Sequence, residues 1–207
     1  MRAGFTSAAG DVPAHRLDAV VTSAAGESFD LFFSCNELPL RPSGSALAVA
    51  GLIPAMRRGE TLEVSAPVSP RLVESVDAIV ELLCAFHPDL HPVALSAPLE
   101  SCVARVYPSR TAAFFTGGVD SFYTLLKHRE EIGTLVYVHG FDVALDNTEL
   151  RAKVSGSLRE AAGRFGKRFV EVETNLRAWL DLHAAWGPVT HGAALAAVAH
   201  VLDPHID

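Results

Sequence analysis

The spacing of hydrophobic and polar positions changes near residue 100 of this chain. Before that point, residues 15–23 and 27–35 alternate with a period of two, the pattern of strands with one buried face. Ala24-Ala25-Gly26 between them predicts a hairpin. The next stretches predict a helix from Ser43 or Ser45 to about Met56, a strand over 61–65, a helix from Ser69-Pro70 and a strand over 91–96. With residues 1–14 expected to form a loose terminus, we predict a small α+β domain over residues 1–100.

After residue 100, strand and helix patterns alternate over short loops. Strands are predicted over 111–115, 134–139 and 168–172, and helices over 121–131, 149–165 and 190–201. Asn147 and Thr148 suit the start of the second helix, and Gly166 suits its end. Such alternation produces βαβ crossovers, so residues 101–207 are predicted to form an α/β domain with a parallel sheet and helices on both faces.

Composition and charge narrow the class of protein. The 207 residues are 49% hydrophobic and 20% charged, which is typical of a globular protein. A net charge of −7 argues against a general nucleic-acid-binding surface, and the longest apolar stretch is too short to span a membrane. Because no secretory signal follows Met1 and the three cysteines are far apart, we expect a cytoplasmic protein with reduced thiols.

One cluster of metal-ligand side chains stands out, formed by Cys84, His87 and His91. Pro88 and Pro92 interrupt any helix there, and a fourth ligand is not evident. We interpret this cluster as a helix end that runs into a loop.

The most informative stretch is the turn between the first strand and first helix of the second half. Residues 116–121 read Thr-Gly-Gly-Val-Asp-Ser, and we refer to them as the glycine turn. Adjacent glycines allow a positive φ and a close approach of the backbone to a ligand, while a helix start offers unpaired N–H groups to an anion. The hydroxyls of Thr116 and Ser121 can donate to phosphate oxygens. Asp120 would repel phosphate unless Mg²⁺ lies between them, so the turn predicts a magnesium-phosphate site.

The glycine turn resembles the Ser-Gly-Gly-x-Asp-Ser signature of the PP-loop ATP pyrophosphatases, a superfamily that includes the asparagine and GMP synthetases and 7-cyano-7-deazaguanine synthase. Thr116 stands in place of the first Ser and keeps its hydroxyl. Neither a Walker loop nor a Gly-x-Gly-x-x-Gly fingerprint is present. The resemblance covers roughly residues 108–202. It implies a Rossmann-like, adenine nucleotide alpha hydrolase-like sheet, with ATP and Mg²⁺ as cofactors.

The resemblance also implies roles for individual residues. Thr116, Gly117, Gly118, Asp120 and Ser121 would carry catalysis, with Asp120 as the metal ligand, and Phe115 and Val119 would complete the pyrophosphate cradle. Further nucleotide contacts are expected at the end of the second strand and at the start of the last helix: Val138, His139, Phe141, Thr190 and His191.

Structural roles without a ligand are alternative interpretations of the residues outside the glycine turn. His139 could simply cap a carbonyl at its strand end, and ordinary helix capping explains Thr190 equally well. Asp142, Asp146 and Asn147 form an acidic loop that could hold Mg²⁺, although a solvated turn is favoured.

From the resemblance we expect an AMP-forming ligase. ATP would adenylate a carboxylate or amide-like carbonyl of a small-molecule acceptor, and a nitrogen nucleophile would then displace AMP. Two alternatives stay open: a sulfurtransferase of the tRNA-thiolation type, for which Cys102 is the one thiol near the second half, and an ATP-binding module without turnover. The partners left open are a second copy of the chain or a protein that donates ammonia or sulfur.

The sheet of the resembled superfamily continues beyond the point where this chain stops. We therefore expect a chain that is incomplete at its C-terminus, binds ATP weakly on its own and completes no ligation.

Overall fold

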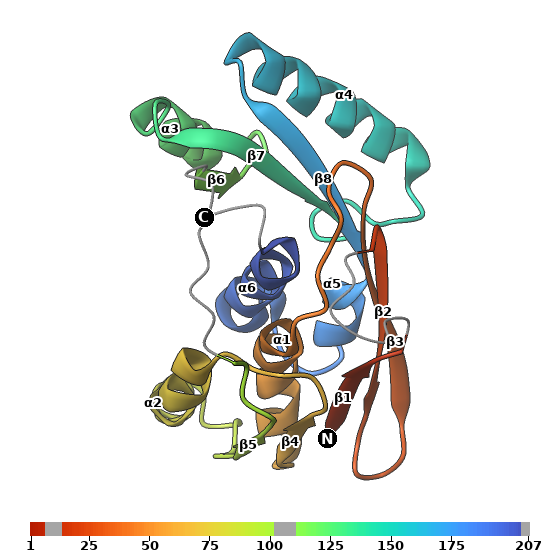
Figure 1. The fold of residues 1–207 in the computed structure, drawn as a ribbon, viewed down its shortest axis with the longest axis vertical. Coiled ribbons are helices and arrows are strands. Elements are labelled where there is room, and N and C mark those ends of the chain that lie inside the picture. Colours follow the sequence, from red (N-terminus) through yellow and green to blue (C-terminus); the bar gives the residue numbers. More distant parts are fainter. Residues whose placement is uncertain (7–13, 102–110, 204–207) are drawn as a thin grey trace.

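A mixed β-sheet organises the fold in a computed structural model, which describes residues 1–6, 14–101 and 111–203. Eight strands lie in the order β5-β4-β1-β2-β3-β8-β7-β6 (Figure 1). The strands are β1 (Arg2–Phe5), β2 (Arg16–Thr22), β3 (Ser28–Cys35), β4 (Leu62–Val64), β5 (Leu95–Ser96), β6 (Thr111–Phe114), β7 (Ile132–His139) and β8 (Arg168–Thr174). The helices are α1 (Gly44–Arg58), α2 (Pro70–Phe86), α3 (Val119–Lys127), α4 (Thr148–Arg164), α5 (Leu176–Leu180) and α6 (His191–Leu202), with a π-helical turn η1 (Trp186–Thr190). The predicted α/β class is confirmed.

Strand direction differs between the two parts of the sheet. Strands β6, β7 and β8 run parallel, with α3 and α4 as their crossovers. β3 joins them in the antiparallel direction, pairing Phe33 to Cys35 with Thr174 to Val172. Asn175 prolongs this ladder, because its Oδ1 accepts from the N–H of Phe32 at 3.0 Å and its Nδ2 donates to the carbonyl of Asp30 at 2.8 Å. The domain boundary expected near residue 100 stays a prediction, and strands from both sides of it share one sheet.

The sequence of β7 explains why helices cover both faces at this end of the sheet. Successive side chains of a strand point to opposite faces, and β7 carries large apolar side chains on both. Leu135 and Tyr137 pack in a cluster with Leu125 of α3 and Leu158 of α4. Val136 and Val138, on the opposite face, instead belong to a larger hydrophobic cluster, which we call the main core. Helices α1, α5 and α6 also contribute to it. Two hydrophobic clusters therefore sandwich β7.

Strands β2 and β3 alternate strictly and have only one core face. Leu17, Leu31 and Phe33 are buried in the main core, while Asp18 and Phe32, on the opposite face, are partly exposed. In Figure 1 the described helices beside these strands all lie on one side of them. Two-sided coverage, which was predicted only for residues 101–207, holds for β7 and β8, whereas β2 and β3 are covered on one face.

The predicted turn and cap residues have the expected backbone conformations. Gly26 closes the β2–β3 hairpin with φ 83°, Gly59 ends α1 with φ 65°, and Gly166 follows α4 with φ 64°. Asn147 caps α4, since its Oδ1 accepts from the N–H of Leu150 at 3.1 Å. Local sequence therefore defines where these elements start and stop.

The expectation of a loose terminus is wrong for the first residues. Arg2–Phe5 forms β1 between β2 and β4, with Ala3 only 3% exposed. The amino group of Met1 donates to the carbonyl of Thr61 at 2.8 Å and lies 3.1 Å from Glu60 Oε2. Four residues are too few to show a strand period, so this pairing could not be read from the pattern. Residues 7–13 lie outside the described part.

Other segments depart from the predicted elements in length or kind. β5 contains only Leu95–Ser96, and α5 and η1 were not predicted. α2 ends at Phe86, as the interpretation of the Cys84 cluster expected. Cys35 and Cys84 are free thiols, whereas Cys102 is outside the described residues. None of the described helices has the length and apolarity to cross a membrane.

Candidate functional site

The glycine turn connects β6 to α3 and is held at both ends by packing. Phe115, the last residue before the turn, is 1% exposed, and its N–H donates to the carbonyl of Val136 at 2.8 Å. Its ring meets the ring of Phe122 edge-on, with centroids 5.0 Å apart. The buried end of β6 and the first turn of α3 are therefore locked together, and the polar residues between them have a defined place beside the end of β7.

Gly117 and Gly118 have different backbone requirements. Gly117 adopts φ 77°, in the left-handed region that favours glycine. A Cβ on Gly117 would also lie 2.8 Å from Cδ2 of Leu158 in α4. Gly118 has φ −77° and ψ 168°, which any residue can adopt, and a Cβ there would meet only Thr116 Oγ1, at 3.4 Å. The fold thus requires glycine at 117 and not at 118.

Among the described residues, the start of α3 has no side-chain cap, a property that it shares with α1, α2, α5 and α6. Within the described part of the chain, no side chain accepts a hydrogen bond as its N-cap. Thr116 Oγ1 approaches the N–H of Gly118 at 3.4 Å, which is long, and Ser121 Oγ donates to the carbonyl of Gly118 at 2.8 Å. Free N–H groups at a helix start, combined with the positive end of its dipole, make an anion site.

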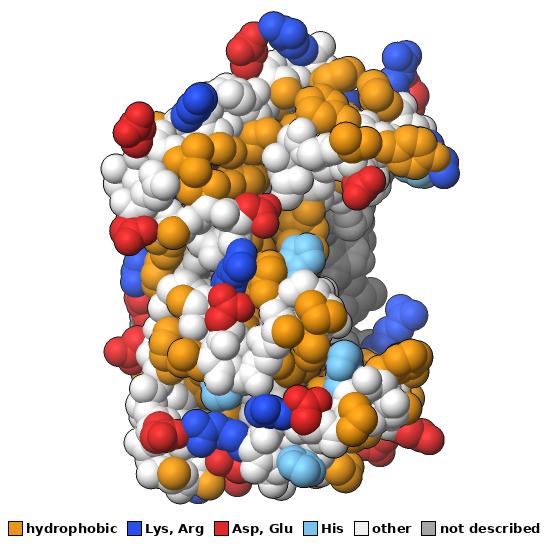
Figure 2. All heavy atoms as spheres, turned by 180° about the vertical axis from the view of Figure 1, so that it is seen from behind, with side chains coloured by type: hydrophobic (Ala, Val, Ile, Leu, Met, Phe, Trp, Pro, Cys, Tyr) orange, Lys and Arg blue, Asp and Glu red, His pale blue; other side chains and the backbone are white. Residues whose placement is uncertain are grey.

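The same corner of the molecule is open to solvent. Val119, Tyr123 and Leu126 expose 84%, 63% and 54% of their surface along one side of α3. Figure 2 shows hydrophobic side chains gathered at the corner that carries α3 and β6. The first turn of α3 therefore projects outward, which leaves the glycine turn accessible to a ligand.

Asp120 lies exposed in the first turn of α3. A carboxylate at this position is stabilised by the helix dipole, so helix stability alone is one reason for an acid there. The described residues contain no group of three or more His, Cys, Asp or Glu side chains that could hold a metal ion. One carboxylate together with phosphate oxygens and water is nevertheless a usual Mg²⁺ environment. The residues present can therefore hold Mg²⁺ only together with a bound phosphate, whose oxygens would supply further ligands.

The outer candidate residues do not gather into one surface. Val138 is buried in the main core, whereas His139, 3% exposed, hydrogen-bonds with α4 on the other face of the sheet. Phe141 and His191 meet around Trp186, whose ring centroid lies 4.9 Å and 5.0 Å from theirs. Thr190 is fully buried, and its Oγ1 donates to the carbonyl of Trp186 at 3.5 Å. Nucleotide contacts at these five positions stay a prediction.

A polar cluster that sequence reasoning missed surrounds His139. Arg151 Nε donates to His139 Nδ1 at 3.3 Å, so Nδ1 must accept and the ring proton lies on Nε2. That Nε2 lies 3.0 Å from Glu171 Oε1 and 3.3 Å from Ser155 Oγ. Arg159 also pairs with Glu171, and Arg151 with Glu173.

The geometry of this cluster excludes a serine-nucleophile triad. In a triad the acid holds Nδ1 while the serine faces Nε2, but here serine and acid both face Nε2 and a guanidinium faces Nδ1. A signal for the cluster was present in the sequence: Arg151, Ser155 and Arg159 repeat every four residues on one helix face, and Glu171 and Glu173 share one strand face. The cluster acts as a structural network that ties α4 to β7 and β8.

The ionisation of Glu171 depends on this network. Its side chain is 13% exposed. Burial is the largest influence and acts to raise its pKa, but hydrogen bonds with Ser155 and His139 and the charge of Arg159 together outweigh burial. The pKa of Glu171 therefore lies below its ordinary value.

We expect Glu171→Gln to destabilise the chain by about 1–3 kcal/mol at pH 7, because the guanidinium of Arg159 and the ring of His139 lose a charged partner. A carboxyl whose pKa falls on folding stabilises the fold above its unfolded pKa and loses this effect as pH falls through the folded value. The difference from the parent chain should thus shrink below about pH 4. Urea unfolding at several pH values measures this difference in unfolding free energy.

Glu160→Gln, which breaks the exposed pair with Arg164, is the matched control. It is expected to cost under about 0.5 kcal/mol. A destabilisation that does not shrink at any pH on acid titration of the folded chain would contradict the assignment.

Comparison with known proteins adds no relative to these observations. No family model, curated protein or solved structure matches the chain. The functional interpretation consequently depends on the glycine turn and its surroundings.

Proposed function

We propose that this chain binds ATP at the glycine turn and cleaves it between the α- and β-phosphates, transferring AMP to an acceptor. The observation that carries the proposal is the left-handed turn at Gly117, which leads the chain onto the uncapped start of α3. Two hydroxyls and one carboxylate flank that start within six residues. An uncapped helix start and exposed hydroxyls suit a polyphosphate.

Each residue of the turn has a distinct role in the proposal. Backbone N–H groups from Gly118 onward donate to the pyrophosphate oxygens, and the Thr116 hydroxyl donates from the strand side. Ser121 would rotate its hydroxyl away from the carbonyl of Gly118, to which it now donates, and toward the ligand. Asp120 would hold Mg²⁺, which supplies positive charge to the leaving pyrophosphate.

The chemical step needs little help from acids or bases. An oxygen of the acceptor attacks the α-phosphorus, the bond from that phosphorus to the oxygen bridging to the β-phosphate breaks, and pyrophosphate leaves with the electron pair. A nitrogen nucleophile then displaces AMP from the adenylated acceptor. Positioning and charge neutralisation supply most of the acceleration.

The surrounding fold supports a nucleotide site at this edge. The parallel unit β6-α3-β7-α4-β8 has its crossover helices on one face and α6 packed on the other. Its glycine turn follows the first of these strands at the carboxyl edge, where ligands of parallel sheets bind. We infer a Rossmann-like, adenine nucleotide alpha hydrolase-like arrangement, with the nucleoside beside the end of β7.

The proposal can be tested by identifying the phosphate bond that is cut. The chain is incubated with ATP, Mg²⁺ and a panel of carboxylates and amides, and the nucleotides are analysed by mass spectrometry. We expect AMP and pyrophosphate, together with exchange of labelled pyrophosphate into ATP when the right acceptor is present. Calorimetry should also show pyrophosphate binding more tightly than AMP, because the turn recognises the β- and γ-phosphates. Formation of ADP, or equal affinity for AMP and pyrophosphate, would contradict the proposal. Tight ATP binding without any AMP or exchange would favour the non-catalytic module.

A further inference from the structure

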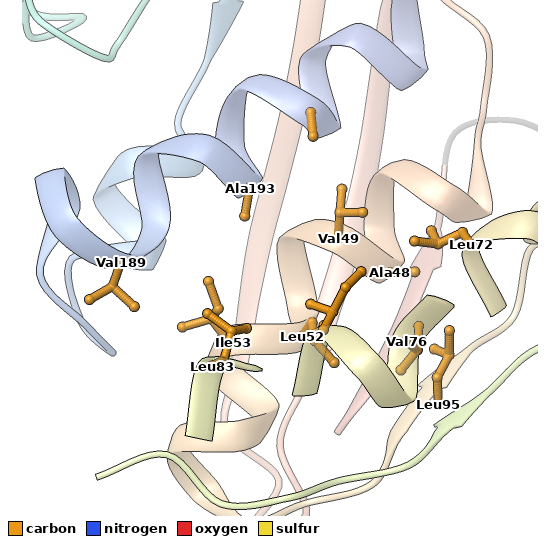
Figure 3. Close-up of a pocket in the computed structure, with 12 residues that line it drawn as sticks. Ala48, Val49, Leu52, Ile53, Leu72, Val76, Leu83, Leu95, Val189 and Ala193 are labelled. Carbon is orange, nitrogen blue, oxygen red and sulfur yellow. The ribbon is translucent and has the colours of Figure 1, made fainter. Parts of the chain in front are cut away.

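An apolar cavity lies between α1, α2 and α6, far along the chain from the glycine turn. It has a volume of about 250 Å³, and among the residues that the structure describes every side chain that lines it is Ala, Val, Leu or Ile. Figure 3 shows Val49 and Ile53 of α1, Leu72 and Leu83 of α2, and Ala193 of α6 around it. The described part of its lining carries no polar side chain that could hold water, an ion or a polar ligand.

The cavity exists because α2 packs incompletely onto the rest of the fold. α2 is 17 residues long, yet only Val76 and Val80 are buried in it. Leu72, Ile79 and Leu83 face the cavity and remain half-buried. Protein interiors normally fill such space with side chains, and an apolar cavity of about 150 Å³ is already large enough to bind benzene. The space beneath α2 is larger, so it can accept a bigger apolar guest.

The shape and size of the cavity narrow the choice of guest. Leu72 to Leu83 follow one face of α2 over three turns, which spans about 16 Å at the rise of an α-helix. A cavity of 250 Å³ drawn out over that length is narrow. A partner helix, about 10 Å across, is too wide for it, whereas an extended alkyl chain is long, thin and free of polar atoms.

We propose that the groove between α1, α2 and α6 binds the aliphatic chain of a small molecule. The guest lies along α2 with its methylene groups against Val49, Ile53, Leu72, Val76 and Ile79, and its polar head stays in solvent. Binding removes apolar surface of both partners from water. The inference is independent of ATP chemistry and would hold if the glycine turn had another role.

Straight-chain alcohols test the proposal directly, with methyl NMR of the whole chain labelled at Ile, Leu and Val. Titration with 1-butanol, 1-hexanol, 1-octanol and 1-decanol should shift the methyl signals of Val49, Ile53, Ile79 and Leu83 in a saturable manner. Affinity should rise about fourfold per methylene and level off once the chain exceeds the groove. Absence of saturable shifts, or shifts located on other methyl groups, would overturn the proposal.

A filled groove provides the matched variant. Ala193 lines the groove from α6 and is half-buried, so Ala193→Leu should occupy the space and reduce 1-octanol affinity at least tenfold. Ala85→Leu, on the exposed side of α2, should leave the affinity unchanged. Unreduced affinity in folded Ala193→Leu would also overturn the proposal. If that variant does not fold, the chain-length series of the parent chain decides alone.

Discussion

Replacing Gly118 with alanine should abolish nucleotide binding while leaving the stability of the chain nearly unchanged. Its backbone, with φ −77° and ψ 168°, suits alanine, and the added Cβ would stand in ordinary contact with Thr116 Oγ1 at 3.4 Å. The fold therefore tolerates the methyl group, with a change in unfolding free energy within about 0.5 kcal/mol. In the proposed site the same methyl group occupies space that phosphate needs to reach the backbone.

Gly117→Ala should lose both binding and stability. Alanine in the left-handed region costs about 1–2 kcal/mol, and its Cβ would lie 2.8 Å from Leu158 Cδ2, which must move. Calorimetric titration with ATP and urea unfolding separate the two effects. Gly156→Ala is the control. Gly156 lies within α4, and a Cβ there would meet nothing within 4 Å, so the change should stabilise the helix by about 0.5–1 kcal/mol and leave ATP affinity intact. Parent affinity for ATP in both the Gly117 and Gly118 variants would reject the phosphate cradle.

Asp120→Asn should reduce Mg²⁺-dependent ATP turnover by about 10²–10³-fold, since the several kcal/mol that a bound metal contributes to the transition state depend on its ligand. The side chain is exposed, so the fold should survive with a loss of only about 0.3–1 kcal/mol from the helix dipole. AMP formation measured over a range of Mg²⁺ concentrations tests this. A higher Mg²⁺ requirement would identify the carboxylate as the metal ligand.

Two further variants make that measurement specific. Glu130→Gln removes an exposed carboxylate just beyond α3, where it pairs with Arg129 at 2.8 Å, and should leave turnover unchanged. Asp146→Asn tests the acidic loop before α4 as the alternative Mg²⁺ site. If Asp146→Asn impairs turnover and Asp120→Asn does not, the metal belongs to the acidic loop and the role of the glycine turn is wrong.

Local patterns predicted the elements that are long or clearly capped. α4 and β7 repeat their apolar residues over many positions, and Asn147 and Gly166 mark the limits of α4. β1 was missed because Arg2–Phe5 is short and pairs with residues that are distant in sequence. The pairing of β3 with β8 was missed for the same reason, since nothing near Ser34 in the sequence specifies Glu173 as its partner. Register between distant strands is determined by the packed core and not by local preference.

Residues of the candidate site that are adjacent in sequence could be predicted, whereas contacts between distant residues could not. The residues of the glycine turn are adjacent in sequence, so one short motif contains them all. The cluster around His139 draws Arg151 from α4 and Glu171 from β8, so the sequence shows the polar faces of the two elements separately and the fold shows that they meet. Sequence reasoning therefore identified His139 but assigned it to nucleotide contact, which stays untested, and missed the ion pairs that hold it.

The narrow joint between β3 and β8 has a consequence for the order in which the chain can fold. Ser34 and its partner Glu173 are separated by about two-thirds of the 207 residues, so closing this contact carries a large loop entropy and belongs to the late stages of folding. During synthesis the hairpin β2–β3 emerges early, yet the outer edge of β3 has no partner until β8 has left the ribosome. For that interval the hairpin presents an open edge with aromatic residues Phe29, Phe32 and Phe33 in its strand. Such edges recruit other chains, and the nascent chain is most exposed to misassembly before β8 has been synthesised.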